Sequence, residues 1–296
     1  MNIGMTLPVT EPGWNRDVLL QWAEKIDTGP FSSLALGERV FFPSPEIMAT
    51  LGACAAITQR VKLVATVLIL PMHHPLMTAK QLATIDMISG GRLVVGVGTG
   101  GRAEDYLASW AGAGDRRLSV LASSVKTMRE VWAGGHEVEG ALRPIEPLPV
   151  QRRGPKVLAG VMGPKGLASA AHWADGIAGM SIMGTVEDIA GSMQAARSAW
   201  EKAGGSNLPV FYSSFWFALG ETADKQIHTH LNRYLNWLDQ DSRNAMIEVA
   251  GFRGSPVALK ERLKAIADTG VDELLLIPTS IDPEEVDRVA EIVASM

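Results

Sequence analysis

The chain has 296 residues, 47% of them hydrophobic and 20% charged, so it can bury a large core and disorder is not expected. The net charge of −5 and the dispersed Lys and Arg residues argue against a nucleic-acid partner, and the single cysteine excludes an intrachain disulfide. No apolar run is long enough to span a membrane, and the first residues lack the basic region of a signal peptide. We therefore expect a cytoplasmic protein without a membrane partner.

Short apolar runs alternate with longer helical patterns along the first half of the chain. We predict strands at 2–8, 32–38, 61–70 and 92–99. We predict helices at 14–28, 44–58 and 75–89, and, after a longer loop at 100–115, a helix that runs to about residue 132. Ser44, Pro45 and Glu46 suit the N-cap, first position and first turn of a helix, and the Gly90–Gly91 pair suits a helix end.

The second half repeats the alternation after a Pro- and Gly-rich excursion at 134–155. We predict strands at 156–161, 176–181, 210–219 and 272–280. We predict helical segments at 164–174, 185–204, 222–250, 255–269 and 282–296. Eight β/α units without a linker favour one domain, residues 1–296, folded as a (β/α)8 TIM barrel rather than as a doubly wound sheet. Ligands are then expected at the C-terminal ends of the strands.

A G-x-G-x-x-G pattern formed by Gly96, Gly98 and Gly101 follows the fourth predicted strand. It is the fingerprint of an NAD-binding turn, but such a turn normally opens the first β/α unit, and here three units precede it. No acidic residue ends a strand about 20 residues later, where a ribose would need one. Two explanations remain: the glycines let a flat ligand lie against the strand end, or they allow tight packing there.

A second glycine-rich segment, GVMGPKG at 160–166, follows a strand and leads into a helix that begins at Pro164. Free amides at such a point bind anions, and Lys165 either adds charge or is a solvated surface residue. Glu38 and Arg39 end the second strand, where they are catalytic candidates or a surface ion pair. His74 before Pro75 either caps a helix or lines the pocket.

Other residues argue against a metal site, a catalytic thiol, and hydrolase or kinase chemistry. The histidine pairs have the wrong spacing for one face, so no metal site is predicted. Cys54 lies in a helical run of small residues and is interpreted as a packed side chain rather than as a catalytic thiol. The chain also lacks the G-x-S-x-G elbow, the P-loop and the H-E-x-x-H motif.

Two stretches of the sequence resemble the luciferase-like oxidoreductases, the superfamily of bacterial luciferase, flavin monooxygenases and coenzyme F420 enzymes. Residues 55–106 contain a His-Pro pair, ATIDMISGGRL and GVGTG at the spacing of that family, and residues 163–179 read GPKGLASAAHWADGIAG. Weaker similarity covers most of the chain. The resemblance implies a TIM-type barrel with a flavin or deazaflavin ring in its C-terminal mouth.

The resemblance also implies roles for particular residues. A non-prolyl cis peptide that backs the ring maps to Thr66–Val67. The residues expected along the cofactor are Gly98, Thr99, Gly100 and Glu104. Those expected to hold its phosphate or tail are Gly160, Val161, Met162, Gly163, Pro164 and Lys165. Many deazaflavin members have Asp-His at the end of strand two, where this chain has Glu38-Arg39; with His74, these two are our catalytic candidates.

The GPK…ADG wording favours coenzyme F420, with hydride transfer to or from a small organic substrate. The alternatives are an FMN-dependent monooxygenase that uses O2 and a separate reductase, and a cofactor-binding barrel without activity. The substrate pocket is expected among the loops after strands two, four and seven, with the 134–155 excursion as its cover. Family members are commonly dimers, so the resemblance also implies a homodimer.

Overall fold

The computed structural model describes residues 1–109, 116–135, 138–204 and 208–296. Its centre is a parallel sheet that closes on itself, because β6 pairs with both β5 and β7. In the described residues, the barrel consists, in ring order, of β1 (Asn2–Thr6), β2 (Ser33–Leu36), β3 (Lys62–Ile69), β4 (Leu93–Gly98), β5 (Lys156–Gly160), β6 (Gly176–Ala178), β7 (Val210–Leu219) and β9 (Glu273–Pro278). The predicted (β/α)8 barrel is confirmed.

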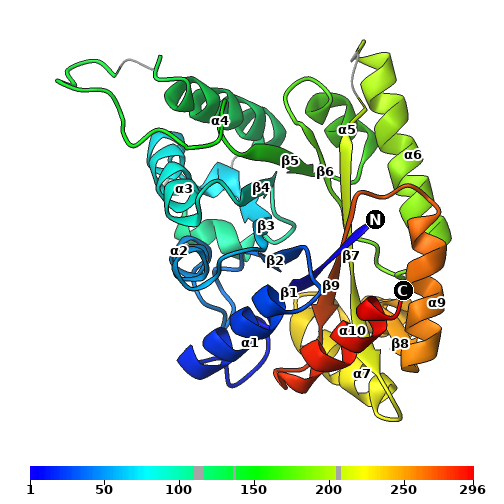
Figure 1. Ribbon diagram of the computed structural model, residues 1–296. Helices are drawn as coiled ribbons and strands as arrows, with labels where there is room; N and C mark the ends of the chain where they lie inside the picture. The colour runs from blue at the N-terminus through cyan, green and yellow to red at the C-terminus, as the bar shows by residue number, and fades with distance from the viewer. Residues whose placement is uncertain (110–115, 136–137, 205–207) are drawn as a thin grey trace.

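Helices pack around the outside of the barrel (Figure 1). They are α1 (Arg16–Thr28), α2 (Ile47–Ile57), α3 (Pro75–Ser89), α4 (Arg117–Trp132), α5 (Pro164–Ala170), α6 (Val186–Lys202), α7 (Ala223–Tyr234), α8 (Gln240–Val249), α9 (Pro256–Ala267) and α10 (Glu284–Ala294). Two short 3-10 helices, η1 (Leu70–Met72) and η2 (Glu104–Ala108), follow β3 and β4. None of the helices described here is long and apolar enough to cross a membrane.

Local sequence signals explain several of the helix ends. Pro75 begins α3, and Gly90 ends it in the left-handed conformation with φ of 66°. Thr185 caps α6 by accepting a hydrogen bond from the amide of Asp188. The cap expected at Ser44 is wrong: the Glu46 carboxylate caps α2 through the amide of Ala49, while the Ser44 hydroxyl donates to the Arg39 carbonyl.

Apolar side chains pack on both faces of the barrel sheet. The larger layer lies between the sheet and the helices. A smaller cluster takes one residue from each of six barrel strands: Ala35, Val64, Val94, Leu158, Tyr212 and Leu275. At the N-terminal end of the strands the fully buried Glu273 accepts a hydrogen bond from Ser33 at 2.5 Å and pairs with Lys62 at 3.3 Å. The barrel is therefore filled at this end, which leaves the C-terminal end for a ligand.

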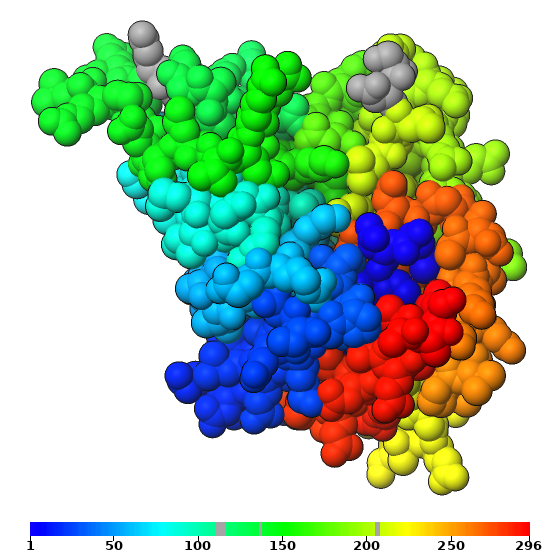
Figure 2. All heavy atoms as spheres, viewed as in Figure 1, coloured from blue at the N-terminus to red at the C-terminus, as the bar shows by residue number. Residues whose placement is uncertain are grey.

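The first and last helices close the outer ring. The indole of Trp22 on α1 donates to the carbonyl of Ile281 at 2.9 Å, and Lys25 pairs with Asp287 on α10 at 2.5 Å. Figure 2 shows these helices side by side in blue and red. The ends of the chain thus complete one continuous barrel.

The 134–155 excursion packs at the wrong end of the barrel to cover the pocket. The backbone amide and side chain of Gln151 donate to the buried carboxylate of Asp86 near the end of α3, and the same side chain bonds to the carbonyl of Leu93, the first residue of β4. The segment projects outward in Figures 1 and 2. The cover expected from the sequence is therefore wrong, although residues 136–137 lie outside the described part of the chain.

The sequence did not predict β8 (Phe252–Gly254). These three residues pair with Phe217–Leu219, the end of the long β7 that extends beyond its pairing with β9. Three residues are too few to show a periodic pattern. The short strand fixes the chain that follows α7 and α8, and α7 carries a residue of the pocket.

Candidate active site

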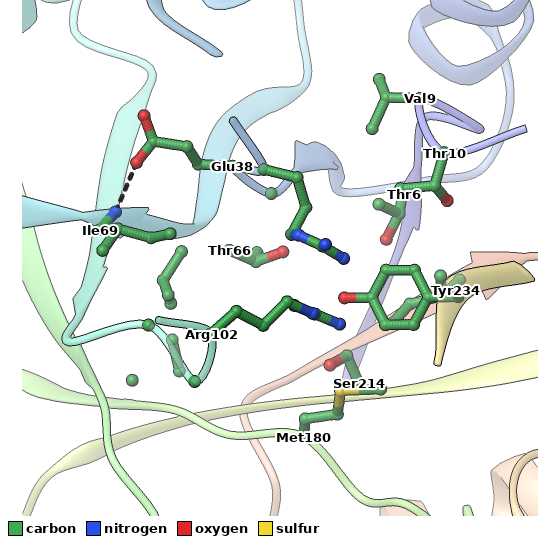
Figure 3. A pocket seen from close by; sticks show the side chains of 18 of the residues that line it. Thr6, Val9, Thr10, Glu38, Thr66, Ile69, Arg102, Met180, Ser214 and Tyr234 are labelled. Atoms are coloured by element: carbon green, nitrogen blue, oxygen red, sulfur yellow. Dashed lines mark hydrogen bonds between the residues drawn. The ribbon is translucent and has the colours of Figure 1, made fainter. Parts of the chain in front are cut away.

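A pocket of about 260 Å³ lies at the C-terminal ends of the strands (Figure 3). Each barrel strand, or the loop that follows it, contributes at least one lining residue. The loops after β2 and β4 take part, as predicted, whereas β7 contributes through the strand itself and through α7 after it. The place of the pocket agrees with the expectation for a barrel enzyme.

A bulge in β3 forms one wall of the pocket. The Thr66–Val67 peptide is cis, as the resemblance predicted, and the pairing of β3 with β4 shifts register between Ala65 and Leu68. A Cβ added to Gly160 would lie 2.6 Å from Cγ1 of Val67, and one added to Gly98 would lie 2.9 Å from its Cγ2. Val67 therefore occupies space that only glycines on β4 and β5 leave open.

The glycines at the end of β4 and in the loop after it have different causes. Gly96 faces the carbonyl oxygen of Ala65, to which an added Cβ would come within 2.4 Å, so packing against the bulge explains Gly96 and Gly98. Gly100 has φ of 64°, a conformation that favours glycine. Gly101 borders open space and lines the pocket. Of the two explanations left open by the sequence, tight packing holds for the first two glycines.

The pocket wall combines hydroxyl groups with apolar side chains. Thr6 and Ser214 project into it, and the buried Oγ1 of Thr6 has no hydrogen-bond partner. The Ser214 hydroxyl donates to the Gly179 carbonyl at 3.1 Å. The apolar lining residues include Val67, Ile69, Ala178, Met180, Trp216 and Ile277. This mixture fits a flat ring with one apolar edge and one polar edge.

Glu38 does not direct its carboxylate into the pocket. One oxygen accepts a hydrogen bond from the Ile69 amide at 2.6 Å, which Figure 3 shows, and the other lies 2.7 Å from Nε2 of His73. Burial alone lowers the pKa of His73, but the hydrogen bond and charge of Glu38, with the charge of Glu46, raise it above its usual value. Glu38 thus anchors η1 to the end of β2, and a catalytic role for it stays a prediction.

Arg39 is buried beside the pocket and is not a surface ion pair. Its guanidinium lies 3.5 Å from the Asp105 carboxylate and 3.3 Å from that of Glu104. Asp105 in turn accepts hydrogen bonds from the amides of Val40 and Phe41, so it fixes the chain after β2. Burial and the positive charge of Arg102 lower the pKa of Arg39.

Sequence reasoning missed Arg102 and Tyr234. The Arg102 guanidinium lies 4.7 Å from the ring centre of Tyr234 and 5.1 Å from that of Trp237. Figure 3 shows the Arg102 head and the Tyr234 hydroxyl pointing toward one another across the pocket. Arg102 directly follows the glycine run, and this position was a signal that the sequence offered. Tyr234 is the last residue of α7, and no sequence feature linked it to the pocket.

The remaining candidates fall into three groups. Thr99 and Glu104 do not line the pocket; the Thr99 carbonyl accepts a hydrogen bond from Tyr106, and Glu104 pairs with Arg39. His74 is exposed at the start of α3 and lies outside the pocket wall. In the last group, Gly160 and Met162 line the pocket, Val161 is buried, and Gly163, Pro164 and Lys165 are exposed at the start of α5. Their cofactor roles stay predictions.

Cys54 is fully buried on α2, which agrees with its interpretation as a packed side chain. Burial raises the pKa of its thiol to about 12. A thiol in that state is a poor nucleophile, and it is not among the residues that line the pocket.

Comparison with known proteins relates residues 1–294 to the family described as luciferase-like monooxygenase. Limonene 1,2-monooxygenase of Rhodococcus erythropolis is 37% identical over 91 residues, which cover 29% of this chain and 23% of that protein. Pyrimidine monooxygenase RutA of Pantoea ananatis is 37% identical over 95 residues, 31% of this chain and 26% of the relative. These matches span about a quarter of the relatives' length.

Solved structures share the whole fold at low identity. Monooxygenase RslO1 from Streptomyces bottropensis has a TM-score of 0.79 and 23% identity, and the match covers 100% of this chain and 98% of that one. An F420-dependent secondary alcohol dehydrogenase has a TM-score of 0.80, 17% identity and coverage of 99% and 98%. The FMN-bound oxygenating component of a Pseudomonas putida diketocamphane monooxygenase has a TM-score of 0.72, 16% identity and coverage of 100% and 98%.

Proposed function

Because the chain belongs to the luciferase-like monooxygenase family, we propose that it is an F420-dependent oxidoreductase with the deazaflavin ring in the barrel mouth. The observation that most supports a ring cofactor is the pocket wall, in which a partnerless buried hydroxyl at Thr6 lies among apolar side chains. The choice of F420 over FMN rests on the GPK…ADG sequence at 163–176. When bound, F420 gives a hydride to the substrate or takes one from it.

Different residues of the pocket would contact different parts of the cofactor. Thr6 and Ser214 would hydrogen-bond its polar edge, and the Thr66–Val67 bulge would back one face. Met180, Trp216 and Ile277 would exclude water from the reacting face, where water competes for hydrogen bonds and weakens electrostatic contacts. Residues 160–165 would hold the phosphate or tail. The side of the pocket with Arg39 and Arg102 is then left for a small-molecule substrate.

A second candidate function is that of an FMN-dependent monooxygenase served by a separate reductase. It is favoured by the names of the curated relatives, which are a limonene and a pyrimidine monooxygenase. The same pocket wall fits either ring, because flavin and deazaflavin share their shape and their polar edge. The two functions differ in what the reduced cofactor reacts with. It reacts with O2 in the second function and with an organic substrate in the first.

Calorimetric titration with F420 and with FMN, each alone, tests the choice. We expect F420 to bind with micromolar or tighter affinity and more tightly than FMN. Reduced F420 should then be consumed anaerobically with an organic acceptor. Binding of FMN alone, with O2 uptake from reduced FMN, would replace the first function by the second. If neither cofactor binds, both proposals fail.

A further inference from the structure

We propose that the pair of arginines at the pocket mouth binds a carboxylate on the substrate, so that the substrate class is small organic acids. This inference rests on the proposed function, because it assigns the substrate side of the same pocket. Arg39 comes from the end of β2 and Arg102 from the loop after β4, and both line the pocket.

Arg39 is a buried arginine with one nitrogen that has no partner. Its side chain is only 5% exposed; Nε lies 3.5 Å from the Asp105 carboxylate, whereas the buried Nη1 has neither a hydrogen bond nor an ion pair. Buried guanidinium nitrogens normally have partners, because leaving them unpaired costs the desolvation of each donor. Glu104 pairs with Nη2 and Asp105 with Nε, so Nη1 is the nitrogen left without a carboxylate. An acceptor that enters the pocket would satisfy Nη1.

The two guanidiniums are paired with carboxylates to different extents. In the described residues, Arg102 has no carboxylate partner, while its guanidinium rests on the rings of Tyr234 and Trp237. Among the acidic residues of the pocket lining, Glu38 is engaged by His73 and Asp105 by Arg39. Because Glu104 also pairs with Arg39, both carboxylates beside the two guanidiniums lie on the Arg39 side. An anion next to Arg102 would pair with it and would relieve its repulsion with Arg39.

Aromatic rings fix both guanidiniums: Arg39 lies 4.8 Å from the ring centre of Phe42 and 5.4 Å from that of Tyr234, which also contacts Arg102. Stacked guanidiniums lose little freedom when they bind, and their planar donor sets match the two oxygens of a carboxylate. The preorganised pair therefore suits a carboxylate better than a neutral amide or a hydrocarbon.

The test uses the protein loaded with whichever cofactor binds, and three matched probe pairs: benzoate and benzamide, phenylacetate and phenylacetamide, hexanoate and hexanamide. At least one acid should bind about tenfold or more tightly than its amide, and Arg102→Gln should remove that preference. Arg16→Gln, which removes a charge from a residue 80% exposed, should leave it unchanged. Arg39→Lys keeps the buried charge but removes the planar donor set, so it should also lower the affinity for the acid. No preference for any acid in the wild-type protein would overturn the inference.

The cofactor's own phosphate is the other possible source of an anion. The cofactor that binds is therefore titrated with and without its phosphate, FMN against riboflavin or F420 against its deazaflavin riboside, in wild-type protein and in Arg102→Gln. The substitution is expected to change the affinity for both forms little and equally. A loss of affinity for the phosphorylated form alone would assign the arginines to the cofactor's anionic tail and overturn the substrate role. A preference for acids in cofactor-free protein that binds neither F420 nor FMN would sink the proposed function but leave this inference standing.

Discussion

At the scale of single residues, the contact of Val67 with its glycine neighbours can be measured directly. Gly160→Ala should lower the free energy of unfolding by about 1–3 kcal/mol, because its new methyl group would overlap Cγ1 of Val67. Adding Val67→Ala should recover part of that loss in a double-mutant cycle. Gly101→Ala is the control, since nothing lies within 4 Å of its added Cβ. Equal losses at Gly160 and Gly101, measured by urea unfolding, would refute this account of the bulge.

The buried hydroxyl of Thr6 gives a second prediction at this scale. Thr6→Val keeps the shape and removes an unsatisfied polar group, so stability should hold or rise, while affinity for the ring cofactor should fall. Thr279→Val is the matched control, because the Thr279 hydroxyl donates to the Phe217 carbonyl at 3.0 Å. That variant should lose about 1–3 kcal/mol. Thermal unfolding with and without cofactor separates the two outcomes; a destabilised Thr6→Val with unchanged affinity would contradict the assignment.

At the scale of elements, the link between β2 and η1 should make stability depend on pH. The pKa of His73 is raised in the folded protein by Glu38, so the stabilisation is fully present below the usual pKa of 6.5 and is lost as the pH rises through the folded value. Denaturant midpoints from pH 6 to pH 9 should fall more in the wild type than in His73→Gln. If the denaturant midpoints of the two proteins changed equally with pH, the Glu38–His73 pair would not contribute to stability.

The excursion also belongs to this scale. Gln151→Ala removes two hydrogen bonds made by its side chain, one of them to the buried Asp86 carboxylate, and should cost about 1–3 kcal/mol of stability. Cofactor affinity should not change, because the contact lies at the end of the barrel opposite the pocket. Arg143→Ala, in an exposed part of the same segment, should be neutral in both measurements. A loss of cofactor affinity in Gln151→Ala would restore the idea that this segment covers the pocket.

At the scale of the whole molecule, alternating strands and helices were enough to predict the barrel, because each crossover helix needs its own apolar stripe and each strand is buried on both faces. The cis peptide at Thr66–Val67 came from the family resemblance, not from the residues alone. The orientation of Glu38 and the burial of Arg39 could not be predicted, because both depend on partners from other β/α units. Tyr234 was missed for the same reason.

We expect a ring cofactor to sit on the β3 bulge in the barrel mouth. The most direct measurement is a crystal structure of the protein with F420 or FMN, whichever binds more tightly. We predict van der Waals contact between the ring and Val67, with Thr6 hydrogen-bonded to its polar edge and Arg39 and Arg102 left on the substrate side. A ring bound elsewhere, with the Thr66–Val67 wall uncovered, would contradict the account.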